Sequence, residues 1–224
     1  MASEGRAVPA LPDRDGYLDR WAALHGGYDP RGNVLVRGWL SGAYAVARPL
    51  AAARVPPDLV TVAGLLVSGG AVALATGSGW WLLGAALVVV LAGLLDNVDG
   101  ALAVLRDQVT PWGSVLDSVT DRVGDLLFLW ALFVAGAPWQ ACASGGALMF
   151  VQEYTRARAG IAGMTEVGIV TVWERPTRVI VTATFLAAAA LLGAPWPELG
   201  AWVWVGLGIV GLTQLIVVVR RRLH

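Results

Sequence analysis

Residues 96–121 read DNVDGALAVLRDQVTPWGSVLDSVTD. Two pairs of aspartates, Asp96 with Asp99 and Asp117 with Asp121, lie in otherwise apolar sequence. On an α-helix, residues three or four apart share one face, so each pair directs two carboxylates to the same place. A Thr-Pro-Trp-Gly turn between the pairs folds the second helix back on the first. The four carboxylates are therefore expected to converge.

Converging carboxylates in an apolar environment repel one another unless a positive charge lies between them. A divalent cation supplies that charge. Ligand sets made only of oxygen favour hard ions such as Mg²⁺, Mn²⁺ or Ca²⁺ over zinc. The sequence therefore predicts a divalent metal site.

The spacing of these residues resembles the signature of the CDP-alcohol phosphotransferase (CDP-alcohol phosphatidyltransferase) family, D-x2-D-G-x2-A-R-x8-G-x3-D-x3-D. One position departs from it, because Val104 stands where the family has arginine. The signature covers about a tenth of the chain, and its specificity comes from seven matches at fixed spacing: Asp96, Asp99, Gly100, Ala103, Gly113, Asp117 and Asp121.

The resemblance implies an enzyme of phospholipid biosynthesis that uses Mg²⁺ or Mn²⁺, with two ions bound. It would transfer a phosphatidyl-type group from a CDP-linked lipid, CDP-diacylglycerol above all, to an alcohol hydroxyl and release CMP. Asp96, Asp99 and Asp117 would be metal ligands. Asp121 would be the base that takes the proton of the acceptor hydroxyl, and it is also a candidate ligand.

The resemblance further implies that the donor nucleotide lies against small residues of the motif helices and against Thr61, near the start of the first crossing. The alternative for the glycines is close helix packing, which small residues serve in membranes. The predicted donor-binding residues are Thr61, Asp99, Gly100, Ala103 and Gly113.

Two arginine-containing stretches, 153–160 (EYTRARAG) and 174–178 (ERPTR), resemble a second region of the phospholipid-synthesising members. There, cationic side chains hold the phosphate of the acceptor alcohol. The alternative is that these arginines simply meet lipid headgroups. The acceptor stays open between glycerol phosphate, inositol phosphate, another phosphorylated alcohol and a lipid alcohol. The predicted acceptor-binding residues are Arg156, Arg158, Arg175 and Arg178.

The composition predicts an all-α integral membrane protein, since 57% of the 224 residues are hydrophobic and only 14% are charged. A net charge of zero gives no support for nucleic-acid binding. The single cysteine excludes an internal disulfide.

The chain divides into a polar N-terminal segment with an amphipathic helix, 1–56, and a six-helix catalytic domain, 57–224. We expect residues 1–30 to be loosely ordered, with His25 exposed and inert, and 31–54 to form a helix in the membrane interface. The apolar segments long enough, or nearly so, to cross the bilayer are 58–76, 79–105, 112–135, 138–160, 176–193 and 198–219.

The arginines predict the orientation of these segments. The connections near residues 77, 137 and 194 carry no basic residue, whereas the N-terminal segment, the other connections and the C-terminal tail carry the arginines. Positive charge favours the cytoplasmic side. Both termini and the aspartates are therefore expected on the cytoplasmic face of a cell membrane, the inner membrane of a bacterium, and the resemblance implies a homodimer.

Two other interpretations remain. The aspartates could bind the coupling ion of a transporter, although such sites tend to lie at the membrane midplane on broken helices. Val104 in place of the motif arginine could also mark a catalytically impaired member of the family.

Overall fold

The computed structural model describes residues 11–164 and 170–223, and the regular structure in these two ranges is entirely helical. This confirms the all-α prediction. The elements are α1 (Arg14–Leu24), the short 3₁₀-helix η1 (Pro30–Gly32), α2 (Val34–Ala52), α3 (Pro57–Ala75), α4 (Trp80–Leu105), α5 (Pro111–Val134), α6 (Trp139–Ile161), α7 (Arg175–Leu192) and α8 (Trp196–Leu223).

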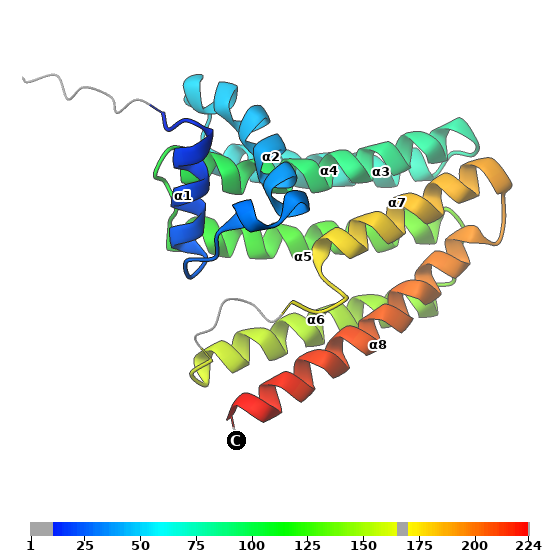
Figure 1. The fold of residues 1–224 in the computed structure, drawn as a ribbon. Coiled ribbons are helices and arrows are strands. Elements are labelled where there is room, and N and C mark those ends of the chain that lie inside the picture. The colour runs from blue at the N-terminus through cyan, green and yellow to red at the C-terminus, as the bar shows by residue number, and fades with distance from the viewer. Residues whose placement is uncertain (1–10, 165–169, 224) are drawn as a thin grey trace, which may run out of the picture.

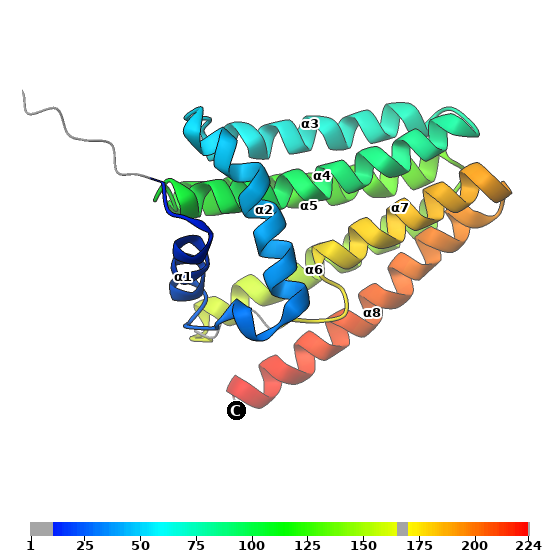
Figure 2. The same cartoon turned by 45° about the horizontal axis from the view of Figure 1, so that its top comes forward.

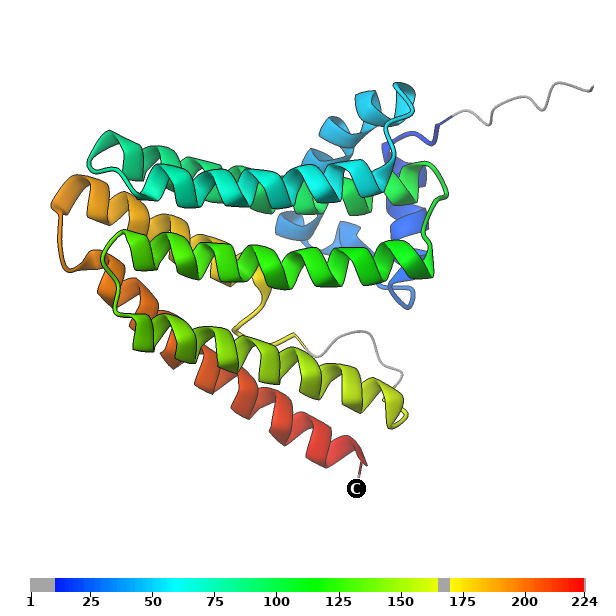
Figure 3. The same ribbon diagram turned by 180° about the vertical axis from the view of Figure 1, so that it is seen from behind.

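The six long helices pack as two groups joined by α7. Helices α3, α4 and α5 contact one another, α6 lies along α8, and α7 packs against both α4 and α8 (Figures 1 and 3). Small residues allow this close approach. A Cβ atom added to Gly93 on α4 would lie 3.0 Å from the γ-carbons of Val179 on α7. Membrane helices use small residues in this way because lipid provides no hydrophobic force to press them together.

The connections alternate between the two ends of the bundle. The turns α3–α4, α5–α6 and α7–α8 lie at one end, and the α4–α5 turn, α1 and the C-terminus lie at the other (Figures 1 and 3). The α4–α5 turn ends where Thr110 caps α5 by accepting a hydrogen bond of 3.0 Å from the Gly113 amide. Pro111 then starts the helix at a position that needs no amide hydrogen.

Within the described residues, four helices are long and apolar enough to cross a membrane: α3, α4, α7 and α8. The protein is therefore a multi-pass membrane protein. Helices α5 and α6 have sufficient length, 24 and 23 residues, but they carry several charged side chains. Several of those charges build the site described below.

The N-terminal segment is more ordered than the sequence predicted. Asp13 caps α1 by accepting a hydrogen bond of 2.8 Å from the Gly16 amide. Tyr17 and Leu18 are only 1% exposed, in a cluster with apolar residues of α2 and α4. Burial raises the pKa of Tyr17 to about 12. The expectation of a loose start was wrong for α1, because these apolar residues find a partner surface that lies far away in the sequence.

Helix α2 begins and ends inside the predicted range 31–54. It runs across α4 and not parallel to it (Figure 2). The boundary predicted between 56 and 57 falls in the turn between α2 and α3.

Candidate active site

Helices α4 and α5 bring three of the four predicted aspartates together. One carboxylate oxygen from each of Asp96, Asp117 and Asp121 lies within 4.8 Å of the others, and all three residues are half-buried. Helices α4 and α5 run antiparallel and are joined by a single turn (Figure 3). Aspartates that are 21 to 25 positions apart in the sequence therefore lie at the same height along the two helices. The predicted convergence is therefore found for these three side chains.

Asp99 lies beside this group but is bonded differently. It is 5% exposed. Its carboxylate accepts hydrogen bonds of 2.5 Å from the Thr61 hydroxyl and 2.6 Å from the Gly100 amide. Thr61 on α3 thus holds the fourth aspartate, and a metal-ligand role for Asp99 stays a prediction.

The donor set fits a hard divalent ion, because it consists of carboxylate oxygens with unused capacity. Oδ1 of Asp121 is buried and has an ion-pair contact with Arg175, but it accepts no hydrogen bond of good geometry among the described residues. Arg175 at the start of α7 is the cation nearest to the group. Its Nη1 lies 2.7 Å from Asp121 Oδ1, and its Nε lies 3.2 Å from Asp96 Oδ1.

A cavity of about 450 Å³ opens next to the aspartates, and Asp96 and Asp117 form part of its wall. All five predicted donor-binding residues line it: Thr61, Asp99, Gly100, Ala103 and Gly113. A Cβ added to Gly100 would meet nothing within 4 Å, so this glycine leaves open space. The structure brings these residues together, and their contact with a donor stays a prediction.

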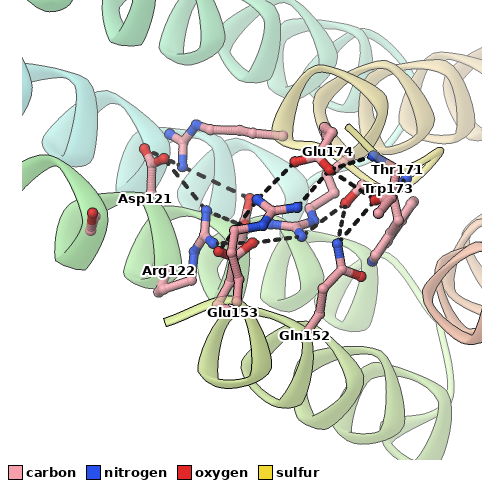
Figure 4. A network of polar contacts seen from close by, with 12 residues as sticks. Asp121, Arg122, Gln152, Glu153, Thr171, Trp173 and Glu174 are labelled. Carbon is pink, nitrogen blue, oxygen red and sulfur yellow. Dashed lines mark hydrogen bonds and ion pairs between the residues drawn. The ribbon is translucent and has the colours of Figure 1, made fainter. Parts of the chain in front are cut away.

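The four predicted acceptor arginines occupy different environments. Arg175 faces the aspartates, as described above. Arg156 is held by Glu174 at 2.7 Å (Figure 4). Arg178 is fully buried, bonded to Asp125 at 2.7 Å and to the Trp173 carbonyl at 3.0 Å. Arg158 is exposed. Arg175 thus lies beside the aspartates, Arg156 is paired with Glu174, and Arg178 is buried against Asp125, so acceptor binding by these arginines stays a prediction.

Arg122 is a site residue that the sequence analysis missed. Its guanidinium lies 2.6 Å from Glu153 on α6 and 3.4 Å from Asp121 (Figure 4). It joins the two groups of helices beside the aspartates. The signal was an arginine inside an apolar segment, directly after a predicted catalytic residue, where a charge is costly unless it has a function.

Glu174 fixes the segment that precedes α7. Its carboxylate accepts hydrogen bonds from Arg156 and, at 2.8 Å each, from the amide and hydroxyl of Thr171. Burial favours a higher pKa for Glu174, but these hydrogen bonds outweigh it and lower the pKa. Gln152 on α6 donates to Thr171 and to the Trp173 carbonyl (Figure 4). These contacts position Arg175, which follows directly.

His25 was wrongly expected to be exposed. It is half-buried and lines the cavity. Its ring stacks on Trp21 with centroids 3.8 Å apart, and its Nδ1 bonds to the Trp21 carbonyl at 2.8 Å. No local pattern in the sequence indicates this, because α1 reaches the cavity only through tertiary packing.

The sequence model of the family described as CDP-alcohol phosphatidyltransferase matches residues 54–219. The chain belongs to this family. It is therefore a phosphotransferase enzyme of phospholipid synthesis, and with its carboxylate group it is one that depends on a divalent metal. Family membership removes the basis for interpreting the aspartates as a transporter site.

Relatives of this CDP-alcohol phosphatidyltransferase include the phosphatidylinositol phosphate synthase of Mycolicibacterium smegmatis, 32% identical over 78% of this chain and 82% of the relative. Two crystal structures of the Mycobacterium tuberculosis phosphatidylinositol phosphate synthase are also similar. The one with CDP-DAG bound has a TM-score of 0.65 and 28% identity over 79% of this chain and 92% of that one. The one with manganese and citrate has a TM-score of 0.67 and 29% identity over 80% and 88%.

Proposed function

We propose that this enzyme transfers the phosphatidyl group of CDP-diacylglycerol to a hydroxyl of an inositol phosphate and releases CMP. The observation that carries the proposal is the position of Asp96, Asp117 and Asp121 between two halves of the site. On one side lies the cavity with the donor-motif residues, and on the other lies the arginine network that starts at Arg175. The names of the relatives support an inositol phosphate as acceptor.

The donor nucleotide occupies the cavity, with its pyrophosphate at Asp96, Asp99 and Asp117. These carboxylates hold the divalent ions, for which the manganese-bound relative is a precedent. When bound, such an ion neutralises the pyrophosphate and stabilises the charge that develops on CMP. Gly100 leaves the backbone of α4 open to the nucleotide.

The reaction is a displacement at the phosphorus on the lipid side of the pyrophosphate. The acceptor hydroxyl oxygen forms a bond to this phosphorus as the bond to the bridging oxygen breaks, and CMP leaves with the electron pair. Asp121 takes the hydroxyl proton on a carboxylate oxygen. Arg175 orients Asp121 through the contact of 2.7 Å between them.

The phosphate of the acceptor binds to Arg175, which contacts the aspartates, and to Arg156, which is paired with Glu174. Guanidinium groups recognise phosphate through paired hydrogen bonds. Glu153 and Glu174 hold Arg156 ready for this role, at 3.7 and 2.7 Å. Arg178 acts indirectly, because its guanidinium is used by Asp125 and Trp173.

Purified enzyme incubated with CDP-diacylglycerol, Mg²⁺ or Mn²⁺ and myo-inositol phosphate is expected to release CMP. Release stops in excess EDTA and returns when the metal is restored, since the carboxylates alone cannot neutralise the pyrophosphate. Undiminished CMP release in EDTA would contradict the metal mechanism. Glycerol 3-phosphate and free inositol serve as control acceptors. A rate of CMP release with either one that equals the rate with myo-inositol phosphate would contradict the proposed acceptor.

We also propose six membrane crossings, formed by α3–α8, with α2 in the cytoplasmic interface and both termini cytoplasmic. Support comes from the connections, because the three at one end of the bundle lack arginine. Residues 57–224 would then form the catalytic domain and 1–56 a cytoplasmic N-terminal segment. A homodimer is proposed on the family resemblance alone.

Cysteines introduced at Ser78 and Gly136, in a variant with Cys142 changed to serine, are expected to react with an impermeant thiol reagent added to intact cells. A cysteine at Gln108 is expected to react only after the membrane is opened, because this residue follows the aspartate-bearing end of α4. Reaction of the Gln108 cysteine in intact cells would reverse the orientation.

A further inference from the structure

One wall of the donor cavity is built by a helix that precedes the family match. The match begins at residue 54, and α1 ends at Leu24. Nevertheless, Tyr17 and Trp21 of α1, together with His25 directly after it, line the same cavity as Asp96 and Asp117. The cavity is therefore completed by a part of this chain that the family motif does not describe.

We propose that α1 is part of the donor site and that its Trp21–His25 pair contacts the nucleotide half of the CDP-linked lipid. The inference rests on the proposed function for the identity of the donor. It adds a specificity-determining element that lies outside the catalytic motif. Its ligand is the base and ribose of a cytidine nucleotide, which a soluble nucleotide such as CMP shares.

The chemistry of the pair suits a nucleobase. The two rings are nearly parallel, with an interplanar angle of 14° and centroids 3.8 Å apart. The bond from His25 Nδ1 to the Trp21 carbonyl, 2.8 Å long, holds the imidazole in this position. A flat aromatic surface of this kind binds a base by stacking. Because the two side chains are already ordered, they lose little conformational entropy when the base binds.

Several contacts hold α1 in place on the motif end of α4. Tyr17 and Leu18 are 1% exposed in the cluster that also contains Val104 and Leu105. Arg20 Nη1 lies 3.5 Å from the carbonyl oxygens of both Val104 and Leu105. These carbonyls belong to the last turn of α4, where the helix itself does not use every carbonyl acceptor.

The docking of α1 also explains why residue 104 is a valine and not the arginine of the family motif. This residue is 7% exposed, at the position where the family motif has arginine. Val104 belongs to the cluster that buries Tyr17 and Leu18 and also borders the cavity, so an arginine at this position would either leave the cluster or bring a costly charge into it. In this chain an apolar residue at 104 and an ordered α1 thus belong together.

The test measures CMP binding to the full-length protein in detergent with Mn²⁺ by calorimetry. Loss of one base–aromatic stack predicts that Trp21→Ala binds CMP about 5- to 150-fold more weakly. The control is Trp80→Ala, which removes an 83% exposed tryptophan at the other end of the bundle, and its affinity is expected to stay unchanged.

Unchanged CMP affinity in Trp21→Ala would overturn the inference while leaving the proposed function intact. A wild-type protein that binds neither CMP nor CDP-diacylglycerol would instead overturn the proposed function and the inference with it. Melting temperatures check the fold of each variant. Trp21→Leu, which keeps an apolar side chain without the ring, carries the same test should Trp21→Ala fail to fold.

Docking of α1 is tested separately through proteolysis. Val104→Arg is expected to increase trypsin cleavage at Arg20 about tenfold or more, because the undocked helix opens more often. Val104→Leu keeps an apolar side chain and is expected to keep the protection. Equal cleavage of Val104→Arg and Val104→Leu would show that α1 docks independently of residue 104.

Discussion

Asp121→Asn is expected to slow the chemical step by about 10²–10⁴-fold, the usual contribution of a general base, while CDP-lipid affinity stays unchanged. The asparagine keeps the size of the side chain but cannot take the acceptor proton. Single-turnover release of CMP measures the chemical step, and calorimetry with the CDP-linked lipid measures donor affinity. Full activity in Asp121→Asn would show that the proposed mechanism is wrong.

Asp117→Asn is the matched control, because Asp117 lies one helical turn before Asp121 on the same face of α5. Asp117→Asn is expected to reduce the affinity for the CDP-linked lipid as well as the rate of CMP release. The reason is that an amide is a poorer, uncharged ligand for the metal that holds the pyrophosphate. The oxygens of both aspartates belong to the group within 4.8 Å, so geometry alone allows either one to bind metal. Equal losses of donor affinity in the two variants would make Asp121 a ligand and require another base.

Arg178→Met is expected to lower the free energy of unfolding by about 3–5 kcal/mol, because it leaves Asp125 buried without its main partner. The side chains of Asp125 and Arg178 are both 0% exposed, and their ion pair is 2.7 Å long. Arg122 lies 3.6 Å from Asp125 and can replace Arg178 only in part. Equilibrium unfolding in mixed micelles measures the effect.

Two further variants show whether the loss comes from the unpaired charge. Arg158→Met removes an exposed arginine and is expected to change stability by less than about 0.5 kcal/mol. The double variant Arg178→Met with Asp125→Leu removes both charges and is expected to be more stable than Arg178→Met alone. If Arg178→Met is as stable as Arg158→Met, Arg178 does not hold α7 in place.

The sequence alone determined the helices and the motif. Apolar segments separated by glycine and proline placed α3–α8 to within a few residues of their observed ends. The spacing of Asp96, Asp99, Asp117 and Asp121 predicted that their carboxylates converge, because helical periodicity and one turn are local properties of the chain. The donor-motif residues were predicted together from the resemblance to the family signature, and they line one cavity.

Only the tertiary structure decided how these residues share their partners. Arg175 and Arg178 are three residues apart and looked equivalent, yet one faces the aspartates and the other is buried behind them. Likewise, α1 is unremarkable as a sequence but closes the cavity, since Tyr17 and Leu18 pack on α4 some 80 residues away. Such contacts depend on which surfaces meet when the helices assemble, and no local pattern in the chain encodes that choice.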